Sequence, residues 1–192
     1  MKQRVLLLGE SPEDIAVITN ALAESDFYID SRVKSIKELC ALAARDTADV
    51  IIIALVKADK AIMNTIEFLI ELHPIPVVMF VNEGDEASSI DSVISGISAY
   101  VINGLEQSRV RPIVTTAITR FHETQKLRRE LDKNRQALRE RKLIERAKGL
   151  LMKQRQCSEE QAYITLRTLA MKQNKRIAEI SAFLIDARAS ME

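Results

Sequence analysis

Val50-Ile51-Ile52-Ile53-Ala54-Leu55-Val56 is the stretch that decides the fold of the first half of the chain. Its seven apolar residues, most of them β-branched, are typical of a strand that is covered on both faces. Such strands occur in parallel sheets, where helices pack on each side. The run is far shorter than the roughly 20 apolar residues of a membrane-spanning helix, so we expect no membrane segment.

The same unit of strand and helix repeats over residues 1–112. Ser11 followed by Pro12 signals the cap and start of a first helix. Five alternating strands predict an α/β fold with a doubly wound, five-stranded parallel sheet of the flavodoxin-like kind, whose sites lie at the carboxyl ends of the strands. The predicted strands are 5–8, 28–33, 50–56, 76–81 and 99–102, and the predicted helices are 12–25, 35–45, 63–72 and 88–95.

A long helix is predicted after this domain, because no glycine or proline interrupts the chain between Pro112 and Gly149. Its Leu, Arg, Glu, Lys and Gln residues are good helix formers. Apolar residues spaced by four, three and four predict a heptad seam and a parallel coiled-coil dimer over 113–140. Asn134 would then set the register, whereas a helix that packs partly on its own domain is the alternative. The seam is Leu127, Leu131, Asn134 and Leu138, extended upstream by Val110, Ile113 and Ala117.

Three helical segments follow and predict a small C-terminal bundle. The first continues the long helix with an apolar stripe that includes Leu143, Ile144 and Leu151. Ser158 and Gln161 form a capping-box signal, which starts a helix over 159–173. A last helix is predicted at 177–187. The residues expected in the core are Leu151, Met152, Leu166, Leu169, Met171 and Phe183.

The two halves of the chain differ in charge. Residues 1–112 hold 10 Lys and Arg against 17 Asp and Glu, a net of −7, whereas residues 113–192 hold 18 against 10, a net of +8. This imbalance indicates two kinds of partner, with an anionic one for the second half. The two cysteines lie far apart without histidines at ligand spacing, so we predict no metal site and no cofactor.

The first half resembles the receiver domain of response regulators, with Glu10, Ala54, Val81 and Asn103 at the ends of its strands. A working receiver needs an acidic pair, an acceptor Asp, a Thr or Ser and a Lys at these places. Only Glu10 matches, and Ala54 has no oxygen to phosphorylate. The resemblance therefore implies a degenerate receiver, or pseudo-receiver, over residues 1–112.

The last part, residues 141–192, resembles the RNA-binding ANTAR module of the AmiR and NasT transcription antitermination regulators. Residues 141–152, Arg-Lys-Leu-Ile-Glu-Arg-Ala-Lys-Gly-Leu-Leu-Met, carry most of this resemblance, which Ser158 to Tyr163 and the final helix support. The order of the domains agrees along the whole chain, and the nitrate-assimilation branch of NasT is the nearest.

Several basic residues could form an RNA surface on this module. Ala147 beside Lys148 would let a nucleic-acid backbone approach closely, or else it packs inside the bundle. Tyr163 would stack on a loop base, or else it belongs to the core. The predicted RNA-binding residues are Arg146, Ala147, Lys148, Tyr163, Arg167, Lys172 and Arg176.

The resemblance implies an antiterminator that stabilises paired stem-loops in nascent leader mRNA, for nitrate or nitrite assimilation or related nitrogen genes. It also implies control by a cytoplasmic ligand sensor related to solute-binding proteins, of the nitrate/nitrite or amide type, in place of phosphorylation. The N-terminus shows no cleavable signal pattern, so a cytoplasmic location is expected.

Two other classes of function are alternatives to the antiterminator. A DNA-binding regulator with a helix-turn-helix is the alternative, although Glu159 and Glu160 would point acidic groups at the major groove. An enzyme is not expected, because His73 and His122 stand alone and no glycine-rich phosphate loop follows the first strand.

Overall fold

The computed structural model describes residues 2–23, 25–45, 48–84 and 96–189, and the chain divides into two compact units. The N-terminal unit spans Met1–Gln125 and the C-terminal unit spans Lys126–Glu192. No helix within the described ranges is both long and apolar enough to cross a membrane.

The N-terminal unit is built on a parallel sheet in the order β2-β1-β3-β4-β5, which confirms the predicted doubly wound α/β fold. Its central strand β3 contains the apolar run of residues 50–56, and Val50 to Ile53 are fully buried there. The strands are β1 (Gln3–Gly9), β2 (Phe27–Val33), β3 (Val50–Lys57), β4 (Val77–Glu83) and β5 (Ala99–Ile102).

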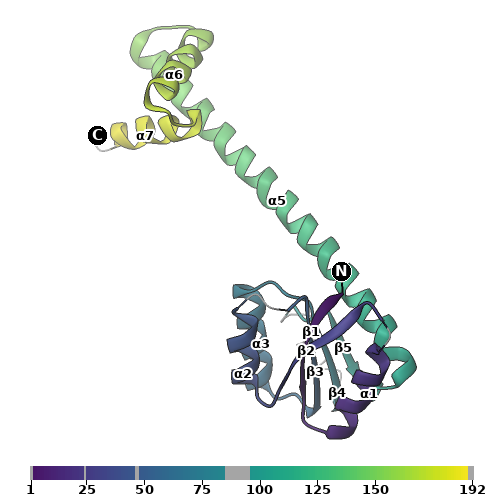
Figure 1. Ribbon diagram of the computed structural model, residues 1–192. Coiled ribbons are helices and arrows are strands. Elements are labelled where there is room, and N and C mark those ends of the chain that lie inside the picture. The colour runs from purple at the N-terminus through teal and green to yellow at the C-terminus, as the bar shows by residue number, and fades with distance from the viewer. Residues whose placement is uncertain (1, 24, 46–47, 85–95, 190–192) are drawn as a thin grey trace. The chain divides into compact units, whose positions relative to one another are not determined.

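Helices cover both faces of this sheet (Figure 1), and each face has its own apolar core. Helices α2 (Ile36–Ala43) and α3 (Lys60–Leu72) lie on one face, and α1 (Pro12–Leu22) lies on the other. The Ser11 hydroxyl caps α1 by accepting a hydrogen bond from the Glu13 amide at 3.1 Å, as predicted. The helix predicted at 88–95 lies outside the described residues.

Helix α5 (Gln107–Arg155) is continuous for 49 residues and begins before Pro112, where the sequence predicted a start after it. Proline inside a helix removes one backbone hydrogen bond. Burial of Val110 and Val114 against the sheet offsets that loss. Val110 and Ala117 thus pack in the core of their own domain, so the predicted upstream extension of the dimer seam is wrong.

The C-terminal unit packs the end of α5 against α6 (Glu159–Gln173) and α7 (Ile177–Ala189). The predicted capping box is present: Gln161 N–H donates to Ser158 Oγ at 3.2 Å, and Ser158 N–H donates to Gln161 Oε1 at 3.0 Å. The core of this unit consists of Ala147, Leu151, Ala162, Leu166, Ala170, Ile180 and Ile185.

Three residues expected in that core lie at the surface. Met152 is 37% exposed, Phe183 is 66% exposed and Met171 is 72% exposed. Alanines at the helix contacts explain the difference, because small side chains bring helices close together and leave no room for larger ones on the inner face. The predicted core positions Leu151 and Leu166 are confirmed.

Candidate functional site

The degenerate receiver pocket lies where the strands of the N-terminal unit end. Gly9 pairs with Ala54, and Val81 pairs with Ile102 just before Asn103, so the ends of β1, β3, β4 and β5 meet at one edge. Ala54 and Val81 are buried apolar side chains. The edge therefore has no acceptor carboxylate at the end of β3.

Glu10 places a carboxylate at this edge, and it is hydrogen-bonded to the backbone. Its Oε2 accepts a hydrogen bond from the Val56 amide at 2.8 Å, and its own amide donates to the Ala54 carbonyl at 3.1 Å. Within the described ranges, no cluster of three or more His, Cys, Asp or Glu side chains is arranged to hold a metal ion. In the described part of the chain, these groups do not form the acceptor and metal-binding cluster that a working receiver needs.

Two aspartates near β3 are used for other purposes. Asp59 caps α3, and its Oδ1 accepts from the Ile62 amide at 2.7 Å. Asp49 precedes β3 at the opposite end from Ala54, and its Oδ2 accepts from the Arg4 amide at 2.7 Å. Neither carboxylate lies at the position of a receiver acceptor.

The predicted RNA-binding residues of the C-terminal unit separate into exposed and buried groups. Ala147 is fully buried between helices, and Lys148 is only 8% exposed. Neither side chain can reach a ligand in this conformation, because neighbouring helices cover it. The exposed residues are Arg146, Tyr163, Arg167, Lys172 and Arg176.

Lys148 forms an ion-pair network inside the unit. Its Nζ lies 2.8 Å from Glu145 Oε1 on the same helix and 2.6 Å from Glu159 Oε1 at the start of α6. Hydrogen bonds to Glu145, the larger cause, and to Glu159 raise the pKa of Lys148. The hydrogen bond between Lys148 and Glu159 also lowers the pKa of Glu159. The network ties α5 to the first turn of α6 and leaves little positive charge for an external anion.

A groove of about 590 Å³ lies at the other end of α6. It brings together Arg167 and Arg176, two of the predicted residues, and adds Lys175 and Met171. Lys148 and Arg146 are not part of it. The groove therefore collects basic residues from the C-terminal half of α6 and from the turn before α7.

The two arginines of the groove differ in their partners. Arg176 donates from Nη1 to Glu140 Oε1 at 2.8 Å and from Nε to Glu179 Oε1 at 3.0 Å. These contacts, led by the hydrogen bond to Glu179, raise the pKa of Arg176, while the Arg176 side chain lowers the pKa of Glu179. Arg167 forms no ion pair with any described residue, so its charge is available to a ligand.

Tyr163, Arg167 and Met171 follow one another at intervals of four on α6, which places them along one side of the helix. Tyr163 is 41% exposed, so the expectation that it belongs to the core is wrong. A flat ring, a guanidinium and a thioether in a row suit an unstacked base beside a phosphate. Lys175 and Met171 are not among the predicted RNA-binding residues. The spacing of Met171 from Arg167 on α6 could have indicated it, whereas Lys175 lies in the turn after α6.

The predicted dimer seam is exposed in the single chain. Leu127, Leu131 and Leu138 are 65%, 49% and 59% exposed, and Asn134 is exposed between them. These three exposed leucines on one helix form an apolar stripe that has no packing partner in the described structure. Such a stripe is typical of a helix that pairs with another helix.

Comparison with known proteins identifies the C-terminal unit. Residues 132–185 match the ANTAR domain family. A nitrate regulatory protein of Klebsiella oxytoca is 46% identical over 68 residues, which are 35% of this chain and 17% of that protein. The transcriptional regulatory protein PdtaR of Mycobacterium tuberculosis is 34% identical over 89 residues, which are 45% of this chain and 43% of PdtaR. The chain thus matches less than half the length of these curated relatives.

Solved structures identify the fold of the N-terminal unit. A response regulator from Thermotoga maritima matches with a TM-score of 0.56 at 21% identity, covering 62% of this chain and 99% of that one. The receiver domain of the response regulator AraT from Geobacillus stearothermophilus matches with a TM-score of 0.54 at 15% identity, covering 65% and 99%. At these identities the match shows a receiver fold and nothing about its chemistry.

The ion pairs of Lys148 predict a pH-dependent loss of stability in Lys148→Met. At about pH 7 the variant should melt at a lower temperature, because Glu145 and Glu159 lose their cation. The pKa of Glu159 is lowered from 4.5 in the folded protein, so its contribution is present above pH 4.5 and is lost as the pH falls through the lowered value. The pKa of Lys148 is raised from 10.5, so its contribution persists up to that pH. Thermal unfolding followed by circular dichroism should show the difference closing as the pH falls from about 7 to about 3.

Lys153→Met serves as the matched control, because Lys153 is exposed on the same helix and forms no ion pair with a described residue. It should melt like the wild type at every pH. A Lys148→Met protein with an unchanged melting temperature at neutral pH would contradict the structural role of Lys148.

Proposed function

We propose that this AmiR/NasT-type regulator, in which a receiver-like domain precedes an ANTAR domain, binds RNA and acts as a transcription antiterminator. Its ANTAR domain and its similarity to a nitrate regulatory protein indicate a transcription regulator of the antitermination kind. RNA binding would stabilise paired stem-loops in nascent leader mRNA and prevent the terminator hairpin from forming. No bond is made or broken in this mechanism.

The row of Tyr163, Arg167 and Met171 beside the basic groove is the observation that carries this proposal. Hairpin loops present unstacked bases next to phosphates, so an exposed ring followed by an unpaired guanidinium fits such a loop. Duplex DNA fits less well, because α6 begins with the exposed carboxylates of Glu159 and Glu160. We assign Arg167, Tyr163 and Lys175 as direct RNA contacts.

A homodimer would offer two ANTAR domains to the two hairpins of one leader. Joining two contacts in one molecule raises the overall affinity well beyond that of either contact alone. The exposed leucines at 127, 131 and 138 support pairing of α5 with the same helix of a second chain.

We further propose that a partner protein, and not phosphorylation, controls this regulator. The buried methyl group of Ala54 stands where an acceptor carboxylate is needed, and Glu10 is bonded to the backbone. The partner we propose is a cytoplasmic sensor, related to solute-binding proteins, that sequesters the regulator until its ligand, of the nitrate/nitrite or amide type, binds. Genes for nitrate or nitrite assimilation are the proposed target.

The pseudo-receiver predicts that the full chain takes up no phosphoryl group from acetyl phosphate. Ala54 has no nucleophilic oxygen, and Asp49 and Asp59 are bonded to backbone amides away from that position. Intact-mass spectrometry after incubation with acetyl phosphate and Mg²⁺ should show the unmodified mass. Ala54→Asp, with the same treatment, tests whether restoring the carboxylate alone restores uptake. A base-labile adduct on the wild-type chain would disprove the proposed independence from phosphorylation.

The apolar stripe of α5 predicts self-association that depends on Leu131 and Leu138. Burying a leucine side chain contributes about 1.5–3 kcal/mol, so replacing both by serine should yield a monomer. Analytical ultracentrifugation measures the mass of each protein. The matched control is the double variant Arg129→Ser and Lys133→Ser, on the outward side of the same helix, which should stay dimeric. Equal masses for the wild type and the leucine variant would exclude this seam.

RNA binding is predicted to depend on Arg167 and Tyr163 in different ways. If about four phosphates are neutralised per ANTAR domain, the logarithm of the association constant should fall against log salt with a slope near −3, at about 0.7 per phosphate. Arg167→Ala should flatten this slope by about 0.7. Tyr163→Ala should weaken binding by about 1–3 kcal/mol without changing the slope, because stacking releases no counterions.

A salt titration on a two-hairpin leader RNA, with Lys37→Ala of the N-terminal unit as control, measures both effects. Duplex DNA of the same sequence and an unstructured RNA serve as competitors. A wild-type slope for Arg167→Ala would show that Arg167 does not contact an RNA phosphate. Tighter binding to duplex DNA than to the hairpins would favour the DNA-binding alternative.

A further inference from the structure

Strand β2, at one edge of the sheet, contains a β-bulge that changes which residues face α1. Val5 pairs with Ile29, but the next residue of β1, Leu6, pairs with Ser31, so Asp30 is an extra residue in β2. Side chains alternate between the two faces of a sheet, and one extra residue reverses that alternation. Phe27, before the bulge, accordingly lies in the core beneath α1, whereas Val33, after it, lies in the core on the opposite face.

The bulge places a cation beside α1. Arg32 pairs with Leu7, whose side chain belongs to the α1-side core, and paired residues of neighbouring strands point to the same face. Without the bulge, Ser31 would pair with Leu7, and Arg32 would point to the opposite face of the sheet. Lys34 follows two residues later. Bulges often re-aim side chains at functional positions.

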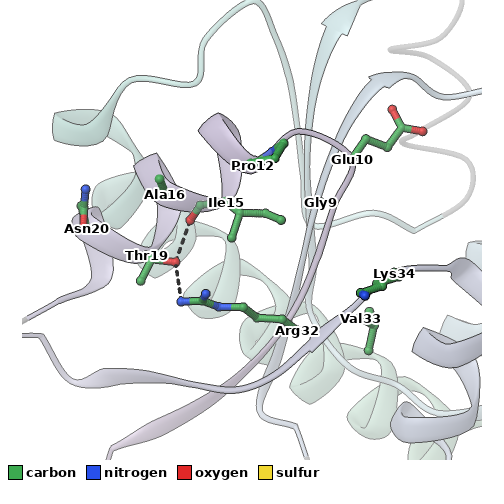
Figure 2. A pocket seen from close by; sticks show the side chains of 10 residues that line it. All are labelled: Gly9, Glu10, Pro12, Ile15, Ala16, Thr19, Asn20, Arg32, Val33 and Lys34. Carbon is green, nitrogen blue, oxygen red and sulfur yellow. Dashed lines mark hydrogen bonds between the residues drawn. The ribbon is translucent and has the colours of Figure 1, made fainter.

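A groove of about 860 Å³ lies between α1 and this end of β2 (Figure 2). Arg32 lines it from β2 and Lys34 from the position just after this strand, and Thr19 and Ile15 line it from α1. Its floor at the end of β1 is Gly9, where a Cβ would lie only 2.5 Å from Ile15 Cγ1. Pro12 and Ala16 add apolar surface to the wall, and Glu10, Asn20 and Val33 also line the groove.

The Arg32 guanidinium is oriented by the protein, and neither cation of this groove is neutralised. The Arg32 guanidinium donates from Nη2 to Thr19 Oγ1 at 3.2 Å, and the Thr19 hydroxyl donates to the Ile15 carbonyl at 2.6 Å. No ion pair with another described residue holds Arg32 or Lys34. Glu10 also borders the groove, but its carboxylate accepts from the Val56 amide and points away from Arg32 in Figure 2.

We propose that this groove is a binding site for a small organic anion with an apolar body. Two unneutralised cations in a domain of net negative charge select for an anionic group, and the fork of Arg32 suits a carboxylate. The volume exceeds what an inorganic ion fills and matches the size of ordinary small-molecule sites. The apolar part of the wall suits the apolar body of such a ligand. The site lies in the N-terminal unit and does not depend on RNA binding by the ANTAR domain.

The test uses the full chain labelled with ¹⁵N and two probes of the same shape, 2-naphthoate and the neutral 2-naphthalenemethanol. Amide chemical shifts report where each probe binds. Naphthoate should give saturable shifts at residues 15–20 and 32–34, and the alcohol should bind at least about tenfold more weakly, since it lacks the charge. Inorganic phosphate should bind more weakly than naphthoate, because it lacks the apolar body.

Arg32→Gln and Lys34→Gln should each weaken naphthoate binding by about tenfold, the effect of removing one charge-assisted contact. Lys37→Gln, an exposed lysine of α2 outside the groove, is the matched control and should bind like the wild type. Unshifted amides elsewhere in the spectrum confirm that each variant is folded.

Three results would overturn the site. These are the absence of saturable shifts up to about 10 mM naphthoate, equal affinity for the neutral alcohol, and wild-type affinity in both groove variants. Each can occur in a protein that binds leader RNA normally, so failure of this site is distinguishable from failure of the antiterminator.

Discussion

Helix α5 supplies core residues to both units, and the rest of the structure depends on this. Val110, Val114 and Ala117 complete the core on one face of the parallel sheet, while Ala147 and Leu151 complete the core of the helical C-terminal unit. A helix of this length gains its stability mainly from packing, because helix propensity alone is weak. Its two ends are fixed by burial, and its middle presents Leu131 and Leu138 to solvent. The middle segment is thus free to pair with a second chain without disturbing either core.

Local signals made much of the fold predictable from the sequence. The apolar run of β3 and the capping box at Ser158 depend on neighbours within a few residues, and both are confirmed. Long-range packing was not predictable in the same way. The burial of Lys148 depends on Glu159, which lies across the turn between two helices, and the exposure of Met171 depends on how closely those helices approach. The bulge in β2 shows no sequence signal, because it depends on the register with β1.

The receiver fold is present here without an acceptor carboxylate at the end of β3, and this changes the electrostatics of that edge of the sheet. In a working receiver, carboxylates at the strand ends repel one another and need a cation. In this chain the end of β3 is the buried methyl group of Ala54, and the Val56 amide satisfies Glu10. The edge is therefore stable without a bound ion. The groove with Arg32 and Lys34 lies elsewhere in the domain, beside α1.

Part of the positive charge of the C-terminal unit is already paired with carboxylates inside the unit, so less of it is free for the proposed RNA ligand. Lys148 is already held by Glu145 and Glu159, and Arg176 is held by Glu140 and Glu179. A phosphate that replaces one of these carboxylates exchanges one ion pair for another. It therefore gains less binding free energy than a phosphate that contacts an unpaired cation. Affinity should therefore concentrate on the cations without carboxylate partners, and Arg167 beside Tyr163 is one of them. Because specificity comes from the few groups that a loop base can reach, this concentration favours a defined hairpin over any polyanion of equal charge.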